Sequence, residues 1–81
     1  MDRSVQPLCA KIISLLQQER KRRKLSKYFV AQESGLSPQM IAYVENGERN
    51  PTLETVLKIA SALQVDLAAI ITEARKEIKK R

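Results

Sequence analysis

The stretch GLSPQMIAYVENGERNP, residues 35–51, holds both glycines of the chain and two of its three prolines. Ser37 is a good N-cap, and Pro38 follows at the first helical position, where its missing N–H costs no hydrogen bond. The helix that starts here is expected to span residues 37–46 and to stop before Gly47, because glycine adopts a positive φ readily. The pattern indicates a short helix between two turns, displayed to something outside the protein.

This short helix has two dissimilar sides on a helical wheel. Ile41, Val44 and Glu45 fall on one side, which is mostly apolar and is expected to face the core. The opposite side carries Gln39, Ala42, Tyr43 and Asn46. Glutamine can bond bidentately to an adenine edge in the major groove, and tyrosine and asparagine can reach phosphates or bases. An ordinary solvated helix face would look the same, so both interpretations stay open on this face alone.

Helical periodicity extends over almost the whole chain, and no segment alternates with period two. The prediction is therefore an all-α domain without strands, spanning residues 1–81. Five helices are expected, over residues 4–23, 26–34, 37–46, 52–64 and 66–80. The second and third are joined by only three residues that include a glycine, which is the layout of a helix–turn–helix whose second helix enters the major groove. Lys27, Arg49 and Asn50 would then flank the groove as phosphate contacts.

The charge balance is consistent with a polyanionic partner. The chain has 15 Lys and Arg against 9 Asp and Glu, a net charge of +6 and a pI near 9.8. Two runs, at residues 20–24 and 75–81, carry ten of the positive charges. Such a basic domain is a candidate nucleic-acid binder, although a generic solvated surface has the same composition. The C-terminal run either lies beside phosphates or only solubilises the helix end.

Several function classes are disfavoured by composition. No apolar run approaches the ~20 residues that span a bilayer, and the N-terminus lacks a secretory signal, which predicts a cytoplasmic protein. With no histidine and one cysteine, no familiar zinc site or internal disulfide can form, and Cys9 is expected in the core. No catalytic constellation or phosphate-cradling loop is present, so we expect no enzyme activity, no cofactor, no metal and no small-molecule ligand.

The segment KLSKYFVAQESGLSPQMIAYVENGERNPTLETVLKIASALQV, residues 24–65, closely resembles the Xre/Cro-CI type of helix–turn–helix transcriptional regulator. The matching residues include Val30-Ala31, Gly35-Leu36-Ser37, Val44-Glu45-Asn46-Gly47 and Arg49-Asn50-Pro51. In size and architecture the chain is similar to Cro-type phage repressors and to the controller proteins of restriction–modification systems. The resemblance implies a five-helix domain that binds double-stranded DNA.

The same resemblance implies roles for individual residues. The positions that read bases are Pro38, Gln39 and Tyr43. Those that lie against the sugar–phosphate backbone are Lys27, Met40, Asn46 and Arg49. Pro38 has no amide to offer a base, so readout falls mainly on Gln39 and Tyr43, while Met40 and Ala42 could touch thymine methyl groups. The resemblance also implies a structural ion pair between Arg20 and Glu45.

The fifth helix is the predicted dimer surface. Its apolar stripe consists of Leu67, Ile70, Ile71, Ala74 and Ile78. A two-fold pair would place two recognition helices in successive major grooves of an inverted-repeat operator, about 34 Å apart. The alternative is that the stripe simply closes the core of the single chain.

Two rival functions also follow from the sequence. The chain could be an antitoxin of the same fold whose main partner is a toxin protein, or an interaction module that has lost DNA binding. Tyr28 and Phe29 lie off the apolar face of the second helix, at positions usually polar in the family. They either mark a surface for a protein partner or pack under the first or fifth helix.

Overall fold

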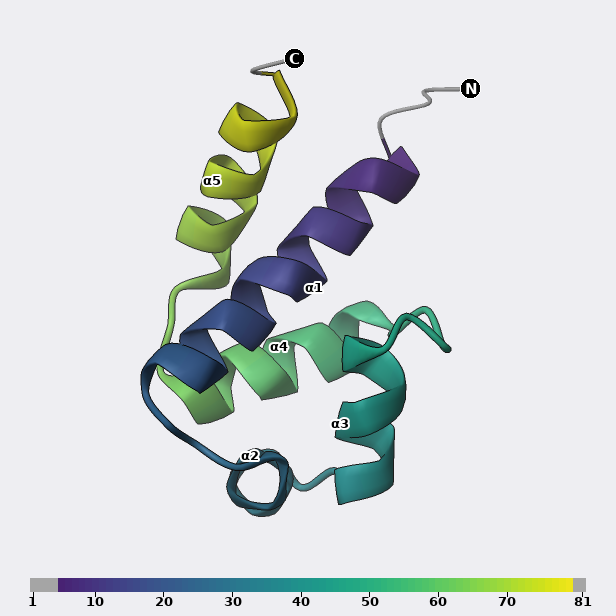
Figure 1. The fold of residues 1–81 in the computed structure, drawn as a ribbon, viewed down its shortest axis with the longest axis vertical. Helices are drawn as coiled ribbons and strands as arrows, with labels where there is room; N and C mark the ends of the chain where they lie inside the picture. The colour runs from purple at the N-terminus through teal and green to yellow at the C-terminus, as the bar shows by residue number, and fades with distance from the viewer. Residues whose placement is uncertain (1–4, 80–81) are drawn as a thin grey trace.

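The computed structural model describes residues 5–79, and within that range it contains five α-helices and no strand (Figure 1). These are α1 (Val5–Arg22), α2 (Lys27–Ser34), α3 (Pro38–Glu45), α4 (Leu53–Leu63) and α5 (Leu67–Lys79). The predicted all-α class with five helices is confirmed, and the described bounds lie within one residue of the expected ranges. Ser4 and Lys80, the outermost residues of the expected helices, lie outside the described residues.

Side-chain caps set where the helices begin. Ser26, Ser37 and Thr52 each accept a hydrogen bond from the backbone N–H three residues further on, at 2.9, 3.0 and 3.1 Å. Each cap satisfies one of the N–H groups that the first turn of a helix leaves unpaired, which is worth roughly 0.5–2 kcal/mol. The starts of α2, α3 and α4 are therefore encoded locally.

The turn between α2 and α3 depends on Gly35. This residue has φ = +77° and donates its N–H to the carbonyl of Ala31. Residues with a Cβ atom adopt this left-handed conformation at a cost, which explains a glycine here. Lys24 and Gln64 end α1 and α4 with φ near +58° and +57° without being glycine, so those two ends carry no local glycine signal.

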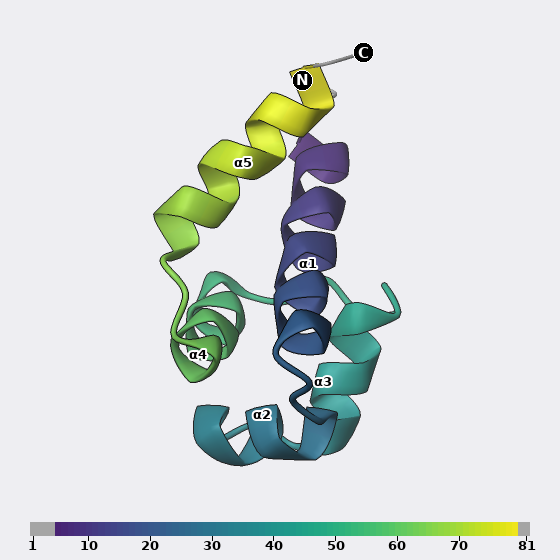
Figure 2. The ribbon, with the colours of Figure 1, turned by 60° about the vertical axis from the view of Figure 1, so that its left-hand side comes forward.

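The core lies between α2, α3, α4 and the C-terminal half of α1. Its buried residues are Leu16, Val30, Ala31, Ile41, Val44, Ile59, Ala60 and Leu63. Ile41 and Val44 are 1% and 2% exposed, so the inner side of α3 is the one expected from the helical wheel. Figures 1 and 2 show α1 rising from this layer with α5 beside it, and both ends of the described chain at the end remote from α2.

One sequence-based expectation about burial is wrong, that for Cys9, and one open alternative, that for Tyr28 and Phe29, is decided by the structure. Cys9 is exposed, because it lies in the part of α1 that extends beyond the core. Tyr28 and Phe29 do not pack under another helix, since they are 61% and 41% exposed. The reason is that α5 packs against α1, while α2 packs against α3 and α4. Ala74, a member of the predicted dimer stripe, is fully buried within the single chain.

The rest of the α5 stripe has a mixed role. Leu67 and Ile70 pack against the core cluster, and Ile71 and Ile78 are half-buried. Much of the stripe therefore closes the core of the single chain, as the alternative interpretation held. Within residues 5–79 no single helix is long and apolar enough to cross a membrane. Only α4 and α5 taken together have the length and composition of a membrane span, and these two helices meet at a bend of 105°.

Candidate nucleic-acid interface

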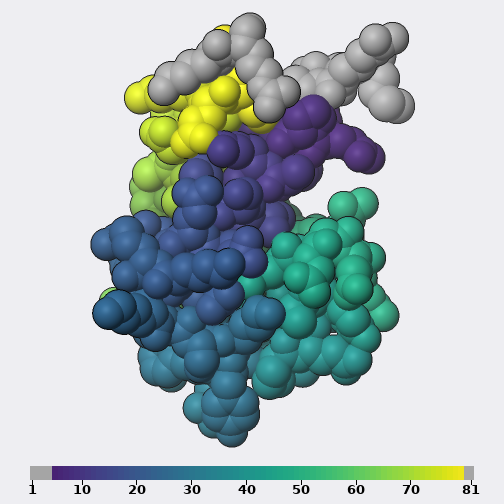
Figure 3. Space-filling model, in the orientation of Figure 1, coloured from purple at the N-terminus to yellow at the C-terminus, as the bar shows by residue number. Residues whose placement is uncertain are grey.

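α3 lies at the surface beside α2, at the end of the molecule opposite the chain ends (Figure 3). Its buried side is locked into the core by Ile41 and Val44. Its other side presents Pro38, Gln39 and Asn46, which are exposed, and Tyr43, which is half-buried. Hydrogen-bonding side chains are thus held on the outside of a helix whose orientation the core determines.

Three of the predicted DNA-contacting residues touch one another. Gln39 Nε2 donates a hydrogen bond of 2.5 Å to Tyr43 Oη. The Arg49 guanidinium carbon lies 4.9 Å from the centroid of the Tyr43 ring, which is a cation–π distance. Sequence reasoning placed all three residues at the interface but did not predict these contacts. We refer to Gln39, Tyr43 and Arg49 as the reader cluster.

The predicted backbone-contacting residues differ in accessibility. Asn46, Arg49 and Asn50 are exposed after α3, and Lys27 is half-buried at the first residue of α2. Met40 stands apart: its side chain packs partly against the core, and its N–H is bonded to Ser37 Oγ. Only the exposed part of the Met40 side chain is thus available to a ligand.

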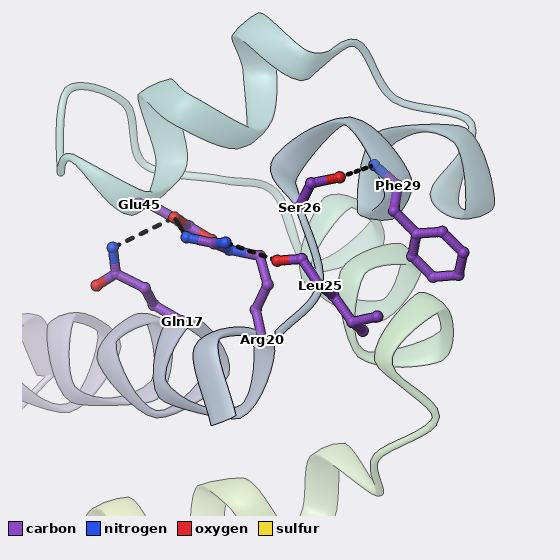
Figure 4. A network of polar contacts seen from close by, with 6 residues as sticks. All are labelled: Gln17, Arg20, Leu25, Ser26, Phe29 and Glu45. Carbon is purple, nitrogen blue, oxygen red and sulfur yellow. Dashed lines mark hydrogen bonds and ion pairs between the residues drawn. The ribbon is translucent and has the colours of Figure 1, made fainter. Parts of the chain in front are cut away.

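A buried ion pair ties α3 to α1. Arg20 Nε donates to Glu45 Oε2 at 2.7 Å and Arg20 Nη2 to Glu45 Oε1 at 2.9 Å, the bidentate geometry that suits guanidinium and carboxylate. Arg20 Nη1 also donates to the Leu25 carbonyl at 2.8 Å, and Gln17 donates to Glu45 (Figure 4). The two charged side chains are only 10% and 8% exposed. The pair implied by the family resemblance is present, and it anchors the last turn of α3.

Most of the basic side chains at residues 20–24 form ion pairs within the protein. Besides Arg20, Arg22 and Arg23 both form ion pairs with Glu19, and Arg23 donates to the Leu63 carbonyl. The hydrogen bond from Arg22 lowers the pKa of the Glu19 carboxyl, and the same bond raises the pKa of Arg22. Across residues 5–79 only Lys21 and Lys24 of this run lack such a partner.

The C-terminal basic run is placed away from α3. Lys76 and Lys79 lie in the last turn of α5, at the end of the molecule opposite α2 and α3 (Figure 1). Lys80 and Arg81 lie outside the described residues. Of the two interpretations of this run, the position of α5 favours the solubilised helix end.

A groove of about 710 Å³ opens between α1, α4, α5 and the loop after α3. Its apolar lining includes Val5, Cys9, Ile13, Leu53, Val56, Leu67 and Ile71. Leu53 and Val5 are 69% and 53% exposed. Asn46, Arg49 and Asn50 also line this groove, so it adjoins the end of the candidate interface. No group of three potential metal ligands occurs in the part of the chain that the structure describes.

Comparison with known proteins agrees with this geometry. A family model described as helix-turn-helix matches residues 16–70. The chain is 37% identical over 54 residues to the immunity repressor protein of Bacillus phage phi105, and that match covers 67% of the chain but only 38% of the repressor. Two crystal structures of the restriction–modification controller protein C.Esp1396I, a point mutant and the wild type, match with TM-scores of 0.82 and 0.81. They are 24% identical, with 91% of this chain and 96% of theirs covered, which shows a shared fold.

Proposed function

Because the chain belongs to the Xre/Cro-CI type of helix–turn–helix DNA-binding transcriptional regulators, we propose that it binds a short inverted-repeat operator as a homodimer. The observation that carries this proposal is the reader cluster, where Gln39 and Tyr43 are bonded together on the outer side of α3. The protein binds DNA in the cytoplasm. This binding requires no cofactor, small-molecule ligand or catalytic step.

The proposed binding mode follows from the helix–turn–helix geometry. α3 enters the major groove, where Gln39 and Tyr43 reach base edges and Pro38 packs at the leading end of the helix. Lys27 at the start of α2, with Asn46, Arg49 and Asn50 after α3, contacts phosphates on either side of the groove. Met40 contributes through the exposed part of its side chain.

The first test is to select binding sites from a random duplex library and to titrate the recovered site by fluorescence anisotropy beside a scrambled duplex. A preference of at least ~10³-fold at physiological salt, with two protomers per site, is expected for a specific dimeric regulator. The two half-sites should lie about 10–10.5 base pairs apart, centre to centre, or a multiple of that. Equal and steeply salt-dependent binding to both duplexes would contradict the proposal.

The groove and the exposed apolar residues beside it support the homodimer. Leu53 and Leu57 on α4 are 69% and 49% exposed, and Ile71 of the α5 stripe lines the same groove. Burying these side chains against a second copy would remove apolar surface from water at roughly 25 cal/mol per Å². The proposed dimer surface therefore combines α4 with the part of the α5 stripe, including Ile71 and Ile78, that the single chain does not fully bury.

Replacing Leu53 by aspartate is expected to weaken dimerisation without unfolding the protomer, because Leu53 is mostly exposed in the single chain. Losing one buried leucine is worth roughly 1.5–3 kcal/mol, so the dimer dissociation constant should rise at least about tenfold. Sedimentation velocity measures the change. Gln32→Asp, at an exposed position of α2 that does not line the groove, is the matched control. An identical dissociation constant for both variants would contradict the proposed surface.

Cys9 offers an independent probe of the same surface, since this free thiol is exposed and lines the groove. Its alkylation rate should fall as the protein concentration passes the dimer dissociation constant. Leu53→Asp should shift that fall to higher concentration.

Replacing Lys27 by methionine is expected to weaken binding to all duplexes alike, because a phosphate contact carries no sequence information. One lost contact should reduce the slope of log K against log salt by about 0.9. Anisotropy titrations at several salt concentrations give both quantities. A change in the base preference of the variant would contradict the assignment of Lys27 to the backbone.

A second candidate function is that of an antitoxin that binds a toxin protein, which the exposed Tyr28 and Phe29 favour. Co-expression with the product of the adjacent gene tests it. On this reading the two proteins copurify, and Tyr28→Ser with Phe29→Ser abolishes the complex while leaving DNA binding intact.

A further inference from the structure

Arg49 contacts an aromatic ring of the protein, and a contact with phosphate would not require this arrangement. Its guanidinium lies over the Tyr43 ring, and within residues 5–79 it has no carboxylate partner. Arg20, Arg22 and Arg23, by contrast, are each held by a glutamate. Arg49 is therefore bound to the aromatic member of the reader cluster, and through it to Gln39.

The backbone of the loop brings Arg49 to this place. Gly47 has φ = +74° and donates its N–H to the Val44 carbonyl. The N–H of Glu48 then donates to the carbonyl of Tyr43 itself, at 2.9 Å. The residue before Arg49 is thus fastened to the residue on which Arg49 stacks. The contact between Arg49 and Tyr43 is built into the turn that ends α3.

The hydrogen bond from Gln39 to Tyr43 determines how the Gln39 amide can face a base. The side-chain nitrogen has two N–H groups, and one of them is used on Tyr43 Oη. The second N–H and the carbonyl oxygen remain. These are the donor and acceptor that match N7 and N6–H of adenine in the major groove. If the N–H that points away from the carbonyl oxygen is the one donated to Tyr43, this bond orients the amide and leaves its adenine-reading edge free.

We propose that Arg49 is a positioning residue for base readout: it holds the Tyr43 ring, whose hydroxyl orients the Gln39 amide toward an adenine. Arg49 then contributes to sequence preference as well as to attraction for phosphates. This inference rests on the proposed function, and it names the base that the recognition helix reads. The half-site recovered by selection contains an A·T pair whose recognition depends on Gln39.

The test measures a discrimination ratio, the dissociation constant on a duplex with that A·T pair changed to G·C divided by the constant on the selected duplex. Arg49→Lys keeps the charge but loses the planar guanidinium that stacks on the ring. It is expected to lower the ratio roughly two- to fivefold, the size of an exposed cation–π contact, and to leave the salt slope unchanged. Arg75→Lys, the same charge-preserving change at an exposed position of α5 remote from α3, should alter neither quantity.

A second arm separates positioning from direct contact. In a Gln39→Ala background, Arg49→Lys should produce no further fall in the ratio, because the amide that Arg49 positions is gone. An equal fall in both backgrounds would show that Arg49 reads DNA itself and would overturn the proposal. An unchanged ratio for Arg49→Lys, in a protein whose wild type prefers its site, would also overturn the proposal. That result would leave the proposed function intact. A wild type with no preferred site would instead remove the proposed function.

The free protein supplies a readout that needs no DNA. Stacking on Tyr43 should shift the δ-proton resonances of Arg49 upfield in the NMR spectrum, and Tyr43→Leu should abolish that shift. Tyr43→Phe keeps the ring and should preserve the shift, while it changes the side-chain amide resonances of Gln39. Arg49 resonances that do not respond to Tyr43→Leu would overturn the proposal.

Discussion

Replacing Glu45 by alanine is expected to lower the free energy of unfolding by about 3–5 kcal/mol, the cost of breaking one partner of a buried ion pair. The Arg20 side chain is only 10% exposed and donates two hydrogen bonds to the Glu45 carboxylate. Without that carboxylate, the Leu25 carbonyl is the one hydrogen-bond acceptor that residues 5–79 still offer to the guanidinium. An 81-residue domain has a total stability of roughly 4–12 kcal/mol. The variant should therefore lose a large share of its total stability.

Urea unfolding followed by circular dichroism measures this loss, with two controls. Glu54→Ala removes one partner of the exposed pair with Lys58 and should cost less than about 1 kcal/mol. The double variant Arg20→Met with Glu45→Leu replaces both charges and should recover most of the stability, since no unpaired charge remains buried. A loss for Glu45→Ala no larger than that for Glu54→Ala would contradict a structural role for the pair.

Replacing Gln39 by alanine is expected to cost about 1–3 kcal/mol of binding free energy on the selected operator and to relax preference at one base pair. The lost bidentate contact is specific to one base. Affinity for duplexes already changed at that pair should therefore fall much less. Anisotropy titrations against duplexes substituted one base pair at a time provide the measurement.

Gln18→Ala is the matched control for this prediction, because Gln18 is an exposed glutamine on α1 outside the candidate interface. It should leave affinity and preference unchanged. An equal loss on every duplex for Gln39→Ala would mean that Gln39 contacts the backbone and not a base.

Most of the local structure could be predicted from short-range chemistry. Ser37 and Pro38 start α3, and Gly35 ends α2, because caps and a positive φ involve only neighbouring backbone groups. The buried side of α3 follows from the spacing of Ile41 and Val44. Family resemblance, and not spacing, implied the partner of Glu45.

The burial of four residues could not be predicted from the sequence, because it depends on which helices pack together. Spacing along a helix shows which residues lie on one side, but it does not show whether another helix covers that side. Tyr28 and Phe29 are exposed because α5 packs on α1, and Cys9 is exposed because α1 extends past the core. Ala74 is buried because α5 packs against α1.

By itself, the sequence determined the all-α class, the five helices and the exposed polar side of α3, since each depends on periodicity and caps within about a turn of the residue concerned. Only the tertiary structure decided which helices pack together and which glutamates form ion pairs with Arg20, Arg22 and Arg23. It alone also decided the contact of Arg49 with Tyr43. Contacts between side chains depend on how loops and helices are placed in three dimensions, and a one-dimensional pattern does not contain those distances.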